Sequence, residues 1–344
     1  MSLPSYHELR VASVIQETHD ACSFEFDVPD ELLADFKYRP GQFLTLRTPW
    51  QDDWLPRCYS LSSSPYDNKR LRVTVKRVND GRGSNWLCDN IKGGDTLQVL
   101  KPAGAFVPKN LDANFLLYAG GSGVTPILSI LRSALKQGKG QVRLIYANRD
   151  EKSVIFKEML RDIGREYPER LQVIHWLDSV QGHTSPMQLA QLGKGMENPQ
   201  VFVCGPELFM QCVEQAMKIA GVNSKSVHVE RFVSLPSESE GGFEAIVEHQ
   251  GSKATHLTVE LDGETREIEC EDGEVLLAAM LREGIKAPHS CMVGSCATCM
   301  CTLVSGEVDL LANDALDKDE LAEGWTLACQ AVATTDKVHL KFPD

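Results

Sequence analysis

The chain contains the stretch Cys291-Met292-Val293-Gly294-Ser295-Cys296-Ala297-Thr298-Cys299, and Cys329 follows 30 residues after the last of these cysteines. The spacing C-x4-C-x2-C…C is typical of four thiolates that hold a pair of irons. Small residues between the cysteines let the backbone wrap closely, so that N–H groups point at the cluster sulfurs. The spacing therefore predicts a [2Fe–2S] site whose metal ligands are Cys291, Cys296, Cys299 and Cys329.

Two other interpretations of the cysteines are a zinc site and a set of unrelated buried thiols. Zinc knuckles usually pair two C-x2-C turns, and the second turn is missing from this sequence. The dense spacing argues against unrelated thiols. Cys301, two residues beyond Cys299 on an expected strand, is predicted to face the core.

Charge divides the 344 residues unevenly. Residues 1–243 hold 28 acidic and 28 basic residues, whereas residues 244–344 hold 20 acidic and 7 basic ones, which accounts for the whole net charge of −13. Such asymmetry indicates a separate acidic module. It argues against a nucleic-acid-binding surface and suits docking to a positively charged partner protein.

Turn residues and periodicity divide the chain into three domains and a linker. Short alternating strands before residue 108 predict an antiparallel β-barrel. Strands and helices then alternate from 115 to a last strand at 227–232, which predicts a doubly wound parallel sheet. A linker at 233–242 precedes paired strands (243–248, 257–261 and 264–269), a helix at 275–282, the cysteine loop and a closing strand at 337–342. We expect domains at 1–108, 109–232 and 243–344.

The first domain carries two signals for a flavin nucleotide. On one expected strand, Arg57 and Tyr59 share a face, which pairs a cation for phosphate with a ring for stacking, and Ser60 can hydrogen-bond a flavin nitrogen. Further on, the turn Gly81-Arg82-Gly83-Ser84-Asn85 opens a short helix, and a helix N-terminus favours a pyrophosphate. Either signal alone is also compatible with a purely structural strand or turn.

The second domain carries two signals for a nicotinamide nucleotide. Gly120-Gly121-Ser122-Gly123-Val124-Thr125-Pro126 joins an expected strand to an expected helix at 126–135, with proline in a favourable first-turn position. Cys204-Gly205-Pro206 ends another strand, at the sheet edge where ligands of doubly wound folds bind. Asp150 favours NADH by repelling a 2′-phosphate, whereas the neighbouring Arg149 argues for NADPH.

With these three motif sets in this order, the chain resembles the ferredoxin–NADP reductase superfamily, in particular the subgroup with a C-terminal plant-type ferredoxin domain of β-grasp fold. The resemblance implies catalytic positions at Tyr59, Ser60, Cys204 and Phe232. It implies that FAD is bound by Arg57, Tyr59, Ser60, Val75, Lys76, Gly81, Gly83, Ser84 and Asn85. It implies that the nicotinamide nucleotide is bound by Gly121, Gly123, Thr125, Cys204, Gly205 and Pro206.

Within this subgroup, the segments 56–61, 84–89, 147–150 and 175–182 resemble the reductase components of 3-ketosteroid 9α-hydroxylases, and phenylacetyl-CoA epoxygenase reductases come next. The resemblance implies electron transfer from NADH, or alternatively NADPH, through FAD and the cluster to a terminal oxygenase of Rieske type. A non-enzymatic electron carrier or redox sensor is the competing function. The polar Met1–Arg10 segment and the glycine-broken apolar run at 115–131 predict a cytoplasmic chain without a membrane span, which we expect to be a monomer.

Overall fold

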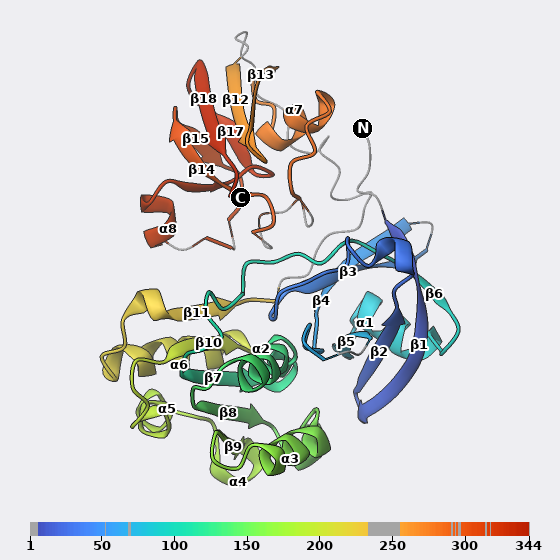
Figure 1. The fold of residues 1–344 in the computed structure, drawn as a ribbon, viewed down its shortest axis with the longest axis vertical. Helices are drawn as coiled ribbons and strands as arrows, with labels where there is room; N and C mark the ends of the chain where they lie inside the picture. Colours follow the sequence, from blue (N-terminus) through green and yellow to red (C-terminus); the bar gives the residue numbers. More distant parts are fainter. Residues whose placement is uncertain are drawn as a thin grey trace.

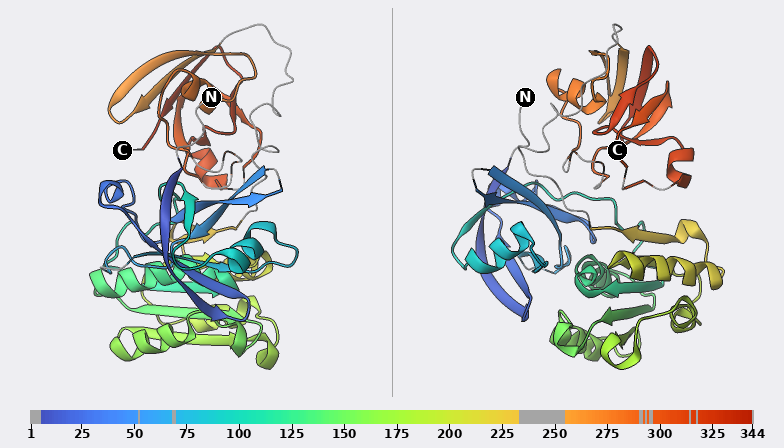
Figure 2. Two further views of the ribbon diagram at one scale, coloured as in Figure 1. Left: turned by 90° about the vertical axis from the view of Figure 1, so that its right-hand side faces the viewer. Right: turned by 180° about the vertical axis from the view of Figure 1, so that it is seen from behind.

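The computed structural model describes residues 6–51, 53–67, 70–232, 255–289, 292, 294, 297–313, 315–316 and 318–343. The chain forms three bodies in sequence order, each built on its own sheet (Figure 1). Further views show helix α2 (Val124–Gln137) between the first sheet and the second (Figure 2). In the part of the chain that is described, no helix is both long and apolar enough to cross a membrane.

The first body is a six-stranded antiparallel barrel. Its sheet runs β4-β3-β6-β1-β2-β5, and a bridge between Leu61 and Val73 joins the end of β4 to β5. Fully buried side chains such as Phe24, Phe26 and Leu46 fill its core. The elements are β1 (His7–Thr18), β2 (Ala21–Asp27), η1 (Asp30–Leu32), β3 (Phe43–Trp50), β4 (Asp53–Ser60), β5 (Leu71–Lys76), α1 (Arg82–Asn90) and β6 (Thr96–Val99).

The second body is a five-stranded parallel sheet in the order β11-β10-β7-β8-β9, with helices on both faces. Helices α2 and α3 cover one face, and α5 and α6 cover the other. The strand order changes direction between β7 and β10, which makes their carboxyl ends the expected ligand site. The elements are β7 (Phe115–Gly120), η2 (Gly121–Gly123), α2, β8 (Val142–Asn148), η3 (Glu151–Ser153), α3 (Lys157–Glu166), β9 (Leu171–Leu177), α4 (Asp178–Gln181), α5 (Pro186–Gly193), β10 (Gln200–Cys204), α6 (Glu207–Ile219), η4 (Ser224–Ser226) and β11 (Val227–Glu230).

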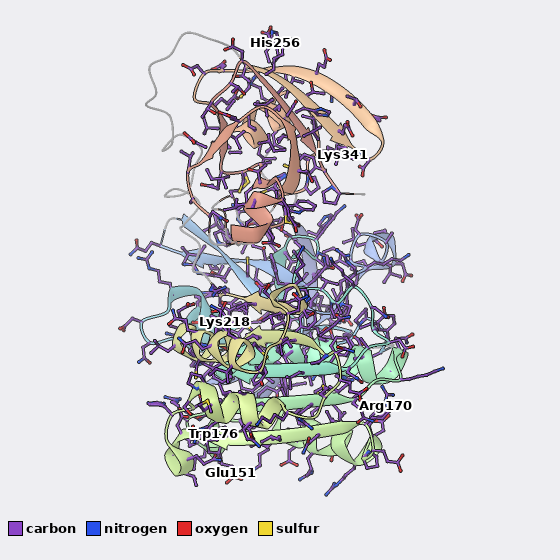
Figure 3. The ribbon with its side chains drawn as sticks, turned by 90° about the vertical axis from the view of Figure 1, so that its left-hand side faces the viewer. Glu151, Arg170, Trp176, Lys218, His256 and Lys341 are labelled. Carbon is purple, nitrogen blue, oxygen red and sulfur yellow. The ribbon has the colours of Figure 1, made fainter. Side chains whose placement is uncertain are left out.

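The labelled residues of this body lie at two opposite edges of its sheet. Figure 3 shows Glu151 and Trp176, near the carboxyl ends of β8 and β9, on the opposite side of the view from Arg170. Arg170 precedes β9, and its guanidinium donates to the carbonyls of Leu135 at 2.9 Å and Ala134 at 3.3 Å. This arginine therefore caps the last turn of α2 at the amino edge of the sheet.

The third body is a mixed sheet in the order β13-β12-β18-β14-β16, in which β12 and β18 run parallel, and β15 pairs with β17. Helix α7 packs into the same core that buries Cys301 of β14. This is the expected β-grasp arrangement. The elements are β12 (Thr255–Leu261), β13 (Glu264–Cys270), α7 (Leu276–Arg282), β14 (Met300–Ser305), β15 (Val308–Leu310), α8 (Lys318–Ala322), β16 (Trp325–Leu327), β17 (Ala331–Ala333) and β18 (Lys337–Lys341).

Several element boundaries differ from those expected from the sequence. Helix α2 begins at Val124, two residues before Pro126, because η2 continues directly into it. The strand expected at 227–232 ends at Glu230, so Phe232 lies beyond the sheet. Periodicity did not predict β15, β16, β17 or α8, which are only three to five residues long. The strand expected at 243–248 lies outside the described residues.

Candidate functional site

Strand β4 and helix α1 meet at Arg57 and Gly83. A Cβ on Gly83 would lie 2.9 Å from Cγ of Arg57 and 3.1 Å from the Thr48 hydroxyl oxygen, so only glycine fits this close approach. Gly81 precedes the helix and offers no side chain to cap it. A cationic guanidinium beside a nine-residue helix N-terminus is a favourable setting for a pyrophosphate.

The other residues predicted from this turn hold its shape. The Val78 N–H donates to the Ser84 hydroxyl at 3.3 Å, and the Asn85 side-chain amide donates to the Val78 carbonyl at 3.2 Å. Ser84 and Asn85 therefore fix the turn that leads into α1. Any contact they make with a ligand is an addition to this structural role.

Tyr59 and Ser60 end the same strand in largely buried positions. Burial raises the pKa of the Tyr59 hydroxyl, and the nearby positive charge of Arg57 opposes that shift. Arg57 and Tyr59 are thus neighbours on one face, as strand alternation predicts. Val75 is fully buried in the barrel core, so only its backbone is left for a ligand. The Lys76 ammonium lies 3.7 Å from a carboxylate oxygen of Asp20.

The two predicted nicotinamide motifs touch each other at the carboxyl edge of the parallel sheet. A Cβ on Gly123 would lie 2.1 Å from the Cys204 carbonyl oxygen and 2.6 Å from the Gly205 nitrogen. A Cβ on Gly120 would lie 2.7 Å from Cδ of Pro206. Because β7 and β10 are adjacent parallel strands, their two turns pack backbone against backbone. Glycine is needed here to bring the turns together.

Hydrogen bonds stabilise the first of these turns. The buried Thr125 hydroxyl donates to the Ser122 carbonyl at 3.0 Å, and the Tyr146 hydroxyl donates to the Gly121 carbonyl at 3.1 Å. Gly121 adopts φ of +52°, and a Cβ there would lie 3.7 Å from Nζ of Lys76. The nicotinamide turn thus lies beside the end of barrel strand β5, so the two candidate nucleotide sites adjoin.

Glu230 is a residue of this edge whose role the sequence motifs did not indicate. It is paired with Cys204 in the register of β10 and β11. Burial raises the pKa of Glu230 to about 8, and burial followed by the Glu230 charge raises the pKa of Cys204 well above its usual value. At neutral pH both groups are therefore mostly protonated, so two neutral proton donors stand side by side at the carboxyl ends of β10 and β11.

Phe232 lies two residues beyond the end of β11, and its side chain is half exposed. The intervening Arg231 is held by carboxylates of α6, at 3.4 Å from Glu207 and 3.3 Å from Glu214. Arg231 therefore fixes the backbone just before Phe232. That the ring covers a flavin stays a prediction.

Two of the four predicted cluster ligands lie within the described residues, and they are adjacent. The Cys329 backbone N–H donates to Sγ of Cys299 at 3.4 Å, and both side chains are buried. An N–H donor on a thiolate sulfur is the contact that tunes iron–sulfur potentials. Cys291 and Cys296 lie outside the described residues. Cys301 is fully buried in the core, as predicted.

The buried Gln330 is a second residue that the motifs did not indicate. Its side-chain amide donates to the carbonyls of Met292 and Cys329, both at 2.8 Å. Gly294, with φ of +76°, lies so close that a Cβ would be 3.0 Å from Cγ of Gln330 and 2.6 Å from the Ala312 carbonyl. Gln330 therefore ties the cysteine loop to the turn that carries Cys329, and this donor set fits a cluster.

Comparison with known proteins matches one domain family to each of the three bodies. Residues 8–107 match an oxidoreductase FAD-binding domain, 117–215 an oxidoreductase NAD-binding domain and 259–334 a 2Fe-2S iron-sulfur cluster binding domain. The chain is 48% identical over 338 residues to the ferredoxin reductase component of 3-ketosteroid-9-alpha-monooxygenase from Rhodococcus rhodochrous, covering 97% of this chain and 96% of that one. The chain belongs to this family of oxygenase reductases.

The chain also resembles a subunit of another oxygenase system and a solved reductase structure. One of the subunits of 1,2-phenylacetyl-CoA epoxidase from Escherichia coli K12 is 36% identical over 99% of this chain and 98% of its own. Among solved structures, phthalate dioxygenase reductase, described as a modular structure for electron transfer from pyridine nucleotides to [2Fe-2S], matches with a TM-score of 0.60 and 25% identity over 98% of both chains.

As an oxygenase reductase, the chain is an oxidoreductase with FAD-, NAD- and [2Fe–2S]-binding domains, and it supplies electrons to a partner oxygenase. Three cofactor classes explain its three bodies. Nicotinamides donate electrons in pairs as hydride and an iron pair accepts them singly, so a flavin is needed between them. The protein contributes binding, orientation and electrostatics rather than a general base.

Proposed function

We propose that this reductase serves a terminal oxygenase that hydroxylates a 3-ketosteroid at the 9α position. The observation that carries the proposal is the 48% identity over nearly the whole chain to a reductase component of that system, against 36% for the relative from the phenylacetyl-CoA epoxidase. The acidic third body suits docking to a positively charged surface on the oxygenase. We further propose the cytoplasm as its location, because thiols stay reduced there.

The residue roles that we propose follow the three clusters of contacts. Arg57, Tyr59 and Ser60 hold FAD on β4, the end of β5 at Val75 and Lys76 borders it, and the α1 turn of Gly81, Gly83, Ser84 and Asn85 holds its pyrophosphate. Gly121, Gly123, Thr125 and the Cys204–Pro206 turn hold the nicotinamide nucleotide, and Phe232 covers the flavin ring. Cys291, Cys296, Cys299 and Cys329 ligate the cluster.

We propose NADH as the preferred donor. Arg149, the cation next to the expected ribose position, lies 3.4 Å from Asp20, whose carboxylate offsets the charge that a 2′-phosphate requires. The Asp150 carboxylate accepts from the Ser153 N–H and hydroxyl, both at 3.0 Å, which keeps a negative charge in the same turn. A higher kcat/KM with NADPH than with NADH would contradict this proposal.

The function is tested by NADH-driven turnover with purified oxygenases. The reductase is mixed in parallel assays with a 3-ketosteroid 9α-oxygenase and with a phenylacetyl-CoA epoxidase oxygenase, and NADH oxidation is measured against product formed. We expect coupled product formation with the steroid enzyme and mostly uncoupled NADH oxidation with the other. Coupled turnover with the epoxidase alone would assign the chain to the second system.

A further inference from the structure

The barrel and the parallel sheet are joined where the two nucleotide motifs continue along the chain. Residues 61–67 directly follow Tyr59 and Ser60 at the end of β4. They pack on α2, whose first turn follows Gly121–Gly123. Figures 1 and 2 show α2 between the barrel and the parallel sheet. The contact therefore links the two candidate nucleotide sites by short, continuous segments.

Four buried serines form the centre of this contact, and we call them the serine seam: Ser63, Ser64, Ser129 and Ser133. The Ser129 hydroxyl donates to the Ser63 carbonyl at 2.6 Å, and the Ser64 and Ser133 hydroxyl oxygens lie 2.8 Å apart. All four are at most 5% exposed. The two interdomain hydrogen bonds are thus shielded from water, which makes them directional and costly to break.

The seam has a definite direction of donation. Ser133 donates its hydroxyl proton to the Ser129 carbonyl at 2.7 Å, one turn earlier in α2. Because a hydroxyl has only one proton, Ser64 must donate to Ser133 rather than accept from it. The Ser63 hydroxyl accepts from the Arg72 N–H at 3.1 Å and contacts the Tyr38 hydroxyl at 2.8 Å, which anchors the seam in the barrel. The direction of the two bonds that cross between the bodies is therefore fixed, with Ser129 donating to the Ser63 carbonyl and Ser64 donating to Ser133.

An ion pair borders the seam on α2. Asp67 of the barrel lies 2.6 Å from the Arg132 guanidinium and 3.3 Å from the Lys136 ammonium. Asp67 and Arg132 keep only 12% and 17% of their side chains exposed, so water screens their attraction weakly. The pair adds attraction to the directional bonds of the seam.

We infer that the serine seam, with Asp67 and Arg132, is a positioning device that sets the separation of the nicotinamide turn from the flavin strand. The inference rests on the proposed residue roles. Hydride transfer needs reacting atoms about 3–3.5 Å apart, and a misplacement of about 1 Å costs on the order of 100-fold in rate. A seam one to two helical turns from the nicotinamide motif controls that distance without touching either nucleotide.

The test compares Ser129→Ala/Ser133→Ala with wild type in single-turnover reduction of the FAD-loaded chain by NADH. We expect the limiting rate of flavin bleaching to fall about tenfold or more, with the NADH dissociation constant and FAD content unchanged. The isotope effect with NADH deuterated at the transferred position should rise as hydride transfer becomes rate-limiting. Asp67→Asn, which keeps the side-chain shape, should lower the rate less, and it provides the test if the double variant does not fold.

Ser23→Ala is the matched control, because Ser23 is equally buried and its hydroxyl contacts Thr74 at 2.8 Å and the Glu17 carboxylate at 2.6 Å, both residues of the barrel. A limiting rate for the seam variants equal to that of Ser23→Ala would overturn the inference, as would weaker NADH binding at an unchanged limiting rate. Hydrogen exchange measured without NADH does not depend on the proposed residue roles. It therefore distinguishes failure of the seam inference from failure of the proposed function. The double variant should exchange faster in both 61–67 and α2, and unchanged exchange there also refutes the seam.

Discussion

Replacing Glu230 by glutamine should remove most of the alkaline destabilisation of the parallel-sheet body. The folded-state pKa of Glu230 is about 8, against an ordinary value of 4.5. The folded chain therefore keeps a proton that the unfolded chain releases between these values. Stability falls as pH rises from about 4.5 to 8 and is constant above that. The full shift corresponds to about 5 kcal/mol, and because the side chain is still partly accessible we expect about 2 kcal/mol.

Thermal unfolding of the FAD-loaded protein between pH 5.5 and 9 measures this effect. Glu230→Gln should nearly match wild type at about pH 5.5 and unfold several degrees higher at pH 9, since about 1 kcal/mol moves the Tm of a domain of this size by roughly 4 °C. Glu214→Gln is the control, because it removes a carboxylate of the neighbouring helix whose side chain is 35% exposed. If wild type and Glu230→Gln lose stability in parallel as pH rises, the proton on Glu230 is not the cause.

Three other perturbations test the remaining site. Gly123→Ala should abolish reduction of the flavin by NADH while FAD content stays normal, because its Cβ would lie 2.1 Å from the Cys204 carbonyl oxygen; unaltered flavin bleaching contradicts this. Gln330→Leu should shorten the lifetime of the cluster several-fold in iron and sulfide assays, because the Met292 carbonyl loses its donor. The control Gln172→Leu, at an exposed position, should leave that lifetime unchanged. Equal cluster lifetimes in the two variants would refute the role of Gln330. Electron delivery to the oxygenase should slow as salt is raised, because the third body carries the net charge of −13, and a salt-independent rate would exclude steering by charge.

Much of the fold followed from local signals. The alternation of strands and helices after residue 115 is marked by turn residues such as Gly120–Gly123 and Gly205-Pro206, so the parallel sheet and its longer helices were predicted within a few residues, whereas the four-residue α4 was not. The short elements near Cys329 were not predicted. Strands of three residues, such as Trp325–Leu327, show no periodicity, and their pairing with distant strands determines them.

The sequence motifs missed several residues of the site for one physical reason, which is that the contacts of these residues are formed only in the folded chain. Glu230 is one carboxylate in a short strand, and only its register beside Cys204 explains its raised pKa. Gln330 directly follows a predicted ligand, but its bond to Met292 crosses 38 residues of sequence. The serine seam joins positions more than 60 residues apart. Local patterns identify turns and motifs, whereas contacts of this range depend on the packed tertiary structure.

The parallel-sheet body contacts its two neighbours in different ways. Toward the barrel, the contact is buried and hydrogen-bonded, and α2, which carries two serines of the seam, directly follows the candidate nicotinamide turn Gly121–Gly123. Toward the third body, the described contacts include the ion pair of Lys225 with Glu323 at 3.0 Å, whose side chains are 73% and 55% exposed. Such a pair contributes little stability. Hydride transfer demands fixed contact, whereas an electron can cross several ångströms between groups that do not touch. Hydride transfer to the flavin therefore depends on the tight contact with the barrel, whereas the electrons pass from the flavin to the cluster without crossing the Lys225–Glu323 contact.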